Sequence, residues 1–219
     1  MVGAMTLQTR TDLFIYGAGG FGREVAWLAS TLNLGVDVWR VVAYLDDALG
    51  TRGERLHDVP VMVPEDAVRC YPQARAAIAV GNPRTRVTLA ARLESLGVQF
   101  ATLVHPETQS GPRIALGDGT LICAGNILTT DIRIGAHVHL NLDCTVGHDV
   151  IIADFVTIAP GVHISGNVTV HAGAEIGTGA MIRQGLTIGR GAAVGMGAVV
   201  TKDVPAGETW VGNPARRLR

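Results

Sequence analysis

The sequence has few aromatic residues, few charges and few cysteines. Of the 219 residues, 5% are aromatic and 17% are charged, and the formal net charge is −1. The chain has no run of Lys and Arg, which argues against a nucleic acid partner. The cysteines Cys70, Cys123 and Cys144 form no paired or C-x-x-C pattern, as is typical of reduced thiols. No apolar stretch reaches membrane-spanning length and no signal-peptide core is seen. We therefore expect a cytoplasmic protein with no membrane partner.

Glycine is abundant, with 28 residues, and the second half of the chain has a period of six. From Ile114 the sequence divides into hexads whose third residue is always a branched aliphatic, while the sixth is often Gly, Asp or Asn, which suit turns. The third-position residues are Leu116, Ile122, Leu128, Ile134, Leu140, Val146, Ile152, Ile158, Ile164, Val170, Ile176, Ile182, Ile188, Val194 and Val200. This regularity predicts a repeat architecture.

An aliphatic residue at every sixth position fits neither a continuous strand nor an amphipathic helix. It fits short strands joined by turns, three per coil of about eighteen residues, with the aliphatic side chains stacked inside a triangular prism. Residues i and i+18 should then lie about 4.8 Å apart in neighbouring coils. We predict a left-handed parallel β-helix from about Ile114 to Asp203, within a domain that spans 114–219.

The region before the repeat alternates apolar strands with amphipathic helices. Strand patterns begin at Asp12 and lie near residues 39–47 and 75–81, and helical patterns lie at 21–33 and 87–97. Such alternation predicts an α/β domain over 12–104 with a mainly parallel sheet. Two prolines and Gly111 indicate a linker at 105–113. Residues 1–11 are expected to be disordered.

A glycine-rich turn follows the first predicted strand. Residues 17–22 match G-x-G-x-x-G between a strand and a helix, where a phosphate can approach the backbone and the helix N-terminus. Asp46 and Asp47 close the next strand, and Gly81 and Asn82 close a later one, so all should meet at one sheet edge. The alternative is that the glycines allow only a tight turn and the aspartates only cap loops.

The predicted α/β region is too short for a dinucleotide-binding oxidoreductase. It has about ninety residues, half of a full dinucleotide fold, and a β-helix follows in place of a second nucleotide-binding half. The edge is therefore better suited to a nucleotide attached to another group, such as a sugar.

Together these motifs resemble the sugar-nucleotide N-acetyltransferases of the left-handed β-helix superfamily. The resemblance covers nearly the whole chain. It rests on the glycine-rich turn that runs on to Arg23 and Glu24, and on the segments 45–47, 79–82, 103–106, 146–149 and 211–215. It implies acetyl-CoA as donor, a nucleotide-linked amino sugar as acceptor, and a homotrimer with active sites between subunits. GDP-perosamine, with its C4 amine, is the best-matching acceptor.

The resemblance also implies which residues hold the sugar nucleotide. These are Gly17, Gly19, Gly20, Phe21, Gly22, Arg23, Asp46, Asp47, Gly81 and Asn82. Some relatives have His where this chain has Phe21, which leaves the phosphate contacts open.

Acetyl transfer to an amine needs a general base, for which histidine is suited near neutral pH. The repeat register does not choose among the seven histidines. The resemblance selects His148. Either Asp149 or Asp131, one coil below it, would orient the imidazole, although Asp149 can also be read as a solvated turn residue. The other histidines are expected mostly at the surface, with His105 at the domain junction.

The eighteen-residue period places Gly166 directly above His148, where a glycine leaves room for the acetyl group. Its backbone N–H is a candidate donor to the oxyanion of the tetrahedral intermediate. The pantetheine of acetyl-CoA should continue past Arg183, Gln184 and Gly185, and Lys202 or Arg190 should meet the CoA phosphates.

Three other functions fit parts of the pattern. His137-x-His139 suggests a zinc carbonic anhydrase. Such a site also needs two histidines four or five residues apart, and this sequence has no such pair, so no metal is expected. A non-catalytic sugar-nucleotide-binding scaffold would bind the nucleotide without releasing CoA. A sialic acid or other sugar O-acetyltransferase would use the same donor with a hydroxyl acceptor.

Overall fold

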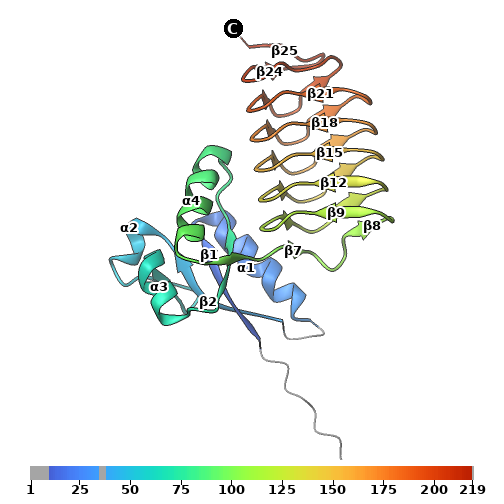
Figure 1. The fold of residues 1–219 in the computed structure, drawn as a ribbon. Helices are drawn as coiled ribbons and strands as arrows, with labels where there is room; N and C mark the ends of the chain where they lie inside the picture. The colour runs from blue at the N-terminus through green and yellow to red at the C-terminus, as the bar shows by residue number, and fades with distance from the viewer. Residues whose placement is uncertain (1–9, 35–37, 219) are drawn as a thin grey trace, which may run out of the picture.

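The computed structural model describes residues 10–34 and 38–218. It contains an α/β domain beside one end of a tall prism of stacked coils (Figure 1). The expected disordered segment 1–11 lies outside the described residues except at its end, where Thr11 already begins the first strand and pairs with Trp39. No helix in these two ranges is long and apolar enough to cross a membrane.

The N-terminal domain is an α/β unit, as predicted. Its elements are β1 (Thr11–Tyr16), α1 (Gly20–Leu32), β2 (Trp39–Leu45), α2 (Asp47–Gly50), β3 (Arg55–Leu56), β4 (Val59–Met62), α3 (Pro64–Cys70), β5 (Arg75–Ile78), α4 (Pro83–Ser95) and β6 (Gln99–Phe100). The sheet order is β3-β4-β2-β1-β5-β6, and only β3 is antiparallel to its neighbour. Because β2 and β5 lie on opposite sides of β1, the connections diverge at the carboxyl end of β1, where open α/β sheets bind ligands.

Helix α4 begins earlier than the predicted helix at 87–97. Asn82 is its N-cap, whose side chain accepts a hydrogen bond from Thr85 N at 3.0 Å, and Pro83 takes the first helical position. Both are favourable helix-start residues. The additional turn carries Arg86 to a fully buried position.

The second domain is a parallel β-helix with three flat faces. Face 1 contains β7 (Leu103–Val104), β10 (Leu121–Ile122), β13 (His139–Leu140), β16 (Thr157–Ile158), β19 (Glu175–Ile176), β22 (Ala193–Val194), β24 (Thr209–Val211) and β25 (Arg216–Arg217). Face 2 contains β8 (Gln109–Ser110), β11 (Ile127–Leu128), β14 (Thr145–Val146), β17 (His163–Ile164), β20 (Met181–Ile182) and β23 (Val199–Val200). Face 3 contains β9 (Ile114–Leu116), β12 (Ile132–Ile134), β15 (Ile151–Ile152), β18 (Thr169–Val170) and β21 (Thr187–Ile188).

The strand register confirms the eighteen-residue coil. Ile127 pairs with Thr145, and Thr145 pairs with His163, each eighteen residues later. The predicted inward aliphatics form the core of the prism, and all but Leu116 are buried. Leu116 is 36% exposed because β9 is the first strand of face 3 and has no coil beneath it.

The β-helix extends beyond the predicted start. Strand β7 pairs with β10, and β8 pairs with β11, so residues 103–113 form part of the first coil. The segment 105–113 is therefore not a free linker between the domains. Near the C-terminus the register shortens, since Ala193 pairs with Thr209, sixteen residues later. The antiparallel pair β24–β25 follows this shortened coil.

Candidate active site

His148 and Asp149 form the turn between β14 on face 2 and β15 on face 3. The His148 Nδ1 and the Asp149 Oδ2 are 2.8 Å apart, and both side chains are about half exposed, at 51% and 56%. Since a carboxylate only accepts hydrogen bonds, Nδ1 carries the proton in this pair, and Nε2 of the neutral ring has a free lone pair. The geometry therefore gives an accessible imidazole with its basic nitrogen turned away from the carboxylate.

Gly166 lies against the ring of His148, as the coil register predicts. A Cβ atom built on Gly166 would lie 2.5 Å from Nε2 and 2.6 Å from Cε1 of the imidazole. The φ angle of Gly166 is outside the left-handed region, so any residue suits the backbone and only the space requires glycine. The space expected to hold the acetyl group is thus occupied by the imidazole itself. Within the described residues the Gly166 N–H donates to no acceptor.

Asp149, and not Asp131, contacts the imidazole. Asp131 is held by Arg113, whose Nη2 donates to Oδ2 at 2.8 Å and whose Nε donates to Oδ1. Thr130 Oγ1 also donates to Oδ2 at 2.9 Å. These hydrogen bonds lower the pKa of Asp131 to about 2, with Arg113 as the main cause.

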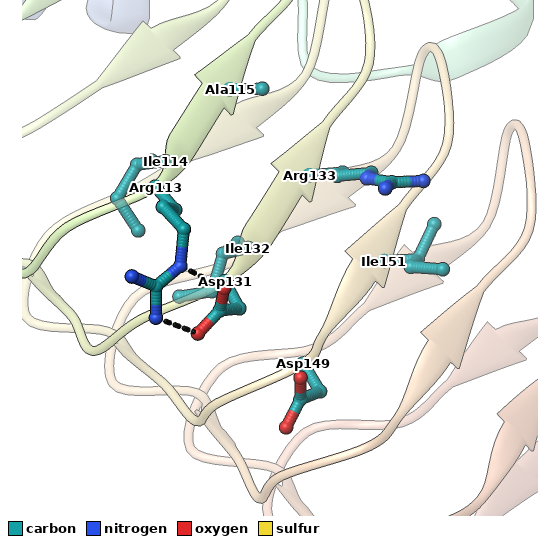
Figure 2. Close-up of a pocket in the computed structure, with 8 residues that line it drawn as sticks. All are labelled: Arg113, Ile114, Ala115, Asp131, Ile132, Arg133, Asp149 and Ile151. Atoms are coloured by element: carbon teal, nitrogen blue, oxygen red, sulfur yellow. Dashed lines mark hydrogen bonds and ion pairs between the residues drawn. The ribbon is translucent and has the colours of Figure 1, made fainter.

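A cleft of about 570 Å³ opens next to this corner, over the first coils of face 3. It is lined by Arg113, Ile114, Ala115, Asp131, Ile132, Arg133, Asp149 and Ile151 (Figure 2). Asp149, which is next to His148 in the chain, and Asp131 lie along one side of the cleft. It is large enough to take part of a polar ligand beside the imidazole.

The residues expected to bind acetyl-CoA lie at the same corner in higher coils. Arg183, Gln184, Gly185 and Lys202 are at the turns from face 2 to face 3, and none is buried. Arg190 does not belong with them. It is at the turn from face 3 to face 1 and lines a 240 Å³ cavity with Arg84 of α4.

Two glycines of the turn at 17–22 lie close to backbone carbonyls. A Cβ on Gly17 would lie 2.8 Å from the Ala79 carbonyl oxygen, and one on Gly22 would collide with the Gly17 carbonyl oxygen. Nothing lies within 4 Å of such an atom on Gly19 or Gly81. The backbone is therefore packed on one side and open on the other. Gly20, Arg23 and Asn82 are also exposed at this edge.

The two aspartates after β2 already have protein partners. Asp46 caps α2, accepting hydrogen bonds from Ala48 N and Leu49 N, both at 2.9 Å. Asp47 accepts hydrogen bonds from Arg92 at 2.7 Å and from the Tyr16 hydroxyl at 3.3 Å. Burial, with Asp47 contributing, raises the pKa of Tyr16 to about 12. The loop-capping interpretation accounts for Asp46.

The glycine-rich edge faces the β-helix of its own chain. The ring of Phe21 packs on His139 with centroids 5.2 Å apart, and Thr157 Oγ1 donates to the Gly81 carbonyl at 2.7 Å. Both partners lie on face 1. The N-terminal domain thus covers the lower part of face 1.

Arg86 connects the two domains and was not identified from the sequence. Its guanidinium donates to four backbone carbonyls at 2.8–3.0 Å, to a fifth at 3.2 Å and to a hydroxyl at 3.0 Å. The acceptors are the carbonyls of Val80, Gly81, His137, Phe155 and Val156, and Thr157 Oγ1. Burial lowers the pKa of Arg86 to about 10, so it remains charged at neutral pH. If Asn82 is taken as the N-cap of α4, the helical period places Arg86 on the buried face of that helix.

His137 and His139, which were expected at the surface, are instead buried, and His105, expected at the domain junction, is buried as well. His105, His137 and His139 are 6%, 4% and 1% exposed, because the N-terminal domain covers them. Burial, followed by the Arg86 charge, lowers the pKa of His137 to about 4 and that of His139 well below its usual value. Arg86 Nη1 lies 3.2 Å from His139 Nδ1. A guanidinium at this distance is unfavourable for a metal cation, so the geometry does not favour a zinc site at His137-x-His139.

The profile of the PglD N-terminal domain family matches residues 12–93. GDP-perosamine N-acetyltransferase of Escherichia coli O157:H7 is 34% identical over 144 residues, 65% of this chain and 64% of that protein. UDP-N-acetylbacillosamine N-acetyltransferase of Bacillus subtilis (strain 168) is 37% identical over 115 residues, 52% of this chain and 51% of that protein. The matched segments thus span less than two thirds of these curated relatives.

Solved structures match over almost the full chain. The acetyltransferase domain of PglB from Neisseria gonorrhoeae FA1090, in complex with acetyl coenzyme A, superposes with a TM-score of 0.87 at 33% identity. It covers 96% of this chain and 100% of that one. PerB from Caulobacter crescentus, in complex with CoA and GDP-perosamine, gives a TM-score of 0.86 at 26% identity. The match covers 96% of this chain and 99% of that chain.

Proposed function

Because the chain belongs to the sugar-nucleotide N-acetyltransferases of the left-handed β-helix superfamily, we propose that it acetylates a nucleotide-linked dideoxy amino sugar with acetyl-CoA. The preferred acceptor is a GDP-linked 4-amino sugar, as in GDP-perosamine. The observation that carries this proposal is the arrangement at the corner: Asp149 holds Nδ1 of His148, and the missing side chain of Gly166 lets Nε2 lie beside a backbone N–H that donates to no acceptor among the described residues.

This arrangement has the groups that direct acetyl transfer requires. The sugar amine attacks the thioester carbonyl while His148 Nε2 takes the proton that the nitrogen loses. The Gly166 N–H donates to the oxyanion. When the intermediate collapses, the C–S bond breaks and the thiolate accepts the proton from the imidazolium, so that CoA leaves as the free thiol. Asp149 keeps the ring in the required tautomer and stabilises its charged form.

The position of His148 relative to the N-terminal domain supports active sites between subunits. The domain covers face 1, whereas His148 lies at the corner between faces 2 and 3, opposite face 1. A side of six residues at about 3.3 Å each is roughly 20 Å long, so this corner lies roughly 17 Å from face 1, the height of the triangle. An acceptor held at the glycine-rich edge of one chain is thus better placed for the His148 of another chain. We therefore propose a homotrimer, with the sugar nucleotide bound by residues 17–23, 46–47 and 81–82.

Acetyl-CoA would lie along the same corner above His148. The pantetheine would pass Arg183, Gln184 and Gly185, and Lys202 would meet the phosphates, because Gln184 and Lys202 continue the column of His148 and Gly166 and the other two flank it. Such a donor, and three free thiols, fit a cytoplasmic reaction.

Replacing Gly166 by Val is expected to abolish turnover without unfolding the protein. A Cβ at this position would displace the half-exposed imidazole of His148, which can swing away at little cost in stability. Gly166→Ala should be intermediate. Steady-state rates from thiol release test this, with light scattering to show that both variants keep the oligomeric state of the parent. Normal turnover by Gly166→Val would exclude the assigned role of Gly166.

The acceptor class can be tested with a thiol-release assay on a panel of sugar nucleotides. The panel should contain GDP-, UDP- and dTDP-linked amino sugars, the matching 4-hydroxy sugars and free sialic acid, each with acetyl-CoA. We expect turnover with the GDP-linked 4-amino sugar and at least 10³-fold less with its hydroxyl analogue, since the site then lacks its nucleophilic amine. Preference for sialic acid would support the O-acetyltransferase alternative. Nucleotide binding without thiol release would support a non-catalytic scaffold.

A further inference from the structure

Arg113, Asp131 and Asp149 occupy equivalent positions in three successive coils. They are eighteen residues apart, and their φ angles are 59°, 55° and 59°, so each side chain leaves the corner from the same backbone conformation. Figure 2 shows them along one side of the face 3 cleft, with Arg113 bound to Asp131. Neighbouring coils are about 4.8 Å apart. Two carboxylates are thus stacked beside His148, and only the upper one touches it.

The lower carboxylate would disturb the base if it were unpaired. Asp131 stays ionised through most of the acidic range because Arg113 and Thr130 lower its pKa to about 2. A second negative charge next to Asp149 would repel that carboxylate and would favour the protonated imidazole, which cannot accept a proton. The two-pronged ion pair with Arg113 cancels this charge.

Other charged and titratable groups lie around this corner. Arg133 lines the same cleft from β12. His163, in the coil above, is bound to Thr145 through Nδ1 at 2.9 Å. Arg183 and Lys202 lie two and three coils above His148 at the same corner. Among the described residues, only Arg113 pairs with Asp131.

We propose that Arg113 is a positioning residue for the acetyl transfer: it neutralises Asp131, so that Asp149 alone acts on His148. The role assigned to the base rests on the proposed function. The charge balance itself is a property of the folded chain and can be measured without turnover. Arg113 contacts neither His148 nor the groups that react, and it acts only through the carboxylate below Asp149.

The test compares Arg113→Gln, Asp131→Asn and the double variant with the parent protein. The titration midpoint of the His148 ring is followed by NMR at low salt, with its signal assigned from a His148→Asn sample. One uncompensated charge roughly 8 Å away should raise the midpoint by about half a unit in Arg113→Gln. Asp131→Asn should lower it, and the double variant should return to within about 0.2 units of the parent. The acid limb of kcat/KM should move by the same amounts.

Arg133→Gln is the matched control, since it removes the same charge from the same cleft without unpairing Asp131. Its shift should stay below about 0.2 units. Equal shifts in Arg113→Gln and Arg133→Gln would mean that only net charge matters, and coincident midpoints in Arg113→Gln and the parent would mean that Asp131 does not reach the base. Either result overturns the proposal. If the parent acetylates no sugar nucleotide, the proposed function fails, while the NMR titration still decides the role of Arg113.

Discussion

Replacing His148 by Asn is expected to lower kcat by about 10²–10⁴, the usual contribution of a positioned general base. The amide of Asn has a size similar to imidazole but takes up no proton at neutral pH. The loss should be in kcat more than in KM, because the imidazole takes up its proton only while the amine attacks, whereas other residues are proposed to hold the sugar nucleotide and acetyl-CoA. The measurement is steady-state thiol release with the acceptor that the panel identifies. The variant should also lose the acid limb of the pH profile.

The control for this experiment is His171→Asn, which changes an exposed histidine at a different corner of the same prism. It should retain activity within about twofold, as is usual for surface substitutions. A loss of less than tenfold in His148→Asn would indicate another base, or an amine that enters the site already deprotonated. In that case Asp149 would orient an imidazole that takes no part in the reaction, and the corner would serve only to bind acetyl-CoA.

The β-helix could be predicted from the sequence because its physics is local and repeated. Every hexad places a branched aliphatic at the third position, and each such residue stacks on one eighteen residues away. The same period placed Gly166 beside His148 without a structure. Outside the repeat the period predicts nothing. The coil formed by β7 and β8 has no regular hexads, and so its sequence did not indicate the β-helix. The exposure of Leu116 depends on what lies beneath it, which the period does not describe.

The domain junction could not be predicted because it depends on which surfaces meet. Nothing in the sequence around His137 and His139 indicates that an arginine about fifty residues earlier lies against them. Arg86 lies one residue before the helix predicted at 87–97, and no role was assigned to it. The choice between Asp149 and Asp131 was open for the same reason, since it depends on the position of the Arg113 side chain.

Replacing Arg86 by Met is expected to destabilise the protein by about 3–5 kcal/mol, as when one partner of a buried charged network is removed. Met has a similar stem but no donors, so five buried or partly buried carbonyls would each lose the hydrogen bond that Arg86 now donates. Two of these carbonyls belong to the N-terminal domain and three to the β-helix, so the domains should also lose their fixed relation. Guanidinium unfolding followed by circular dichroism should then show an early transition of the N-terminal domain, ahead of the β-helix.

Two variants separate the network of Arg86 from its charge. Arg86→Lys keeps the charge, but an ammonium offers three donors from one point and cannot reach carbonyls on both sides, so most of the loss should remain. Arg84→Met removes an exposed arginine two residues earlier in α4 and should change stability by less than about 0.5 kcal/mol. Hydrogen exchange should locate the effect of Arg86→Met at α4 and around His137 and Phe155. A change within about 1 kcal/mol of the parent would mean that water replaces the guanidinium, and that the packing of Phe21 on His139 holds the domains together instead.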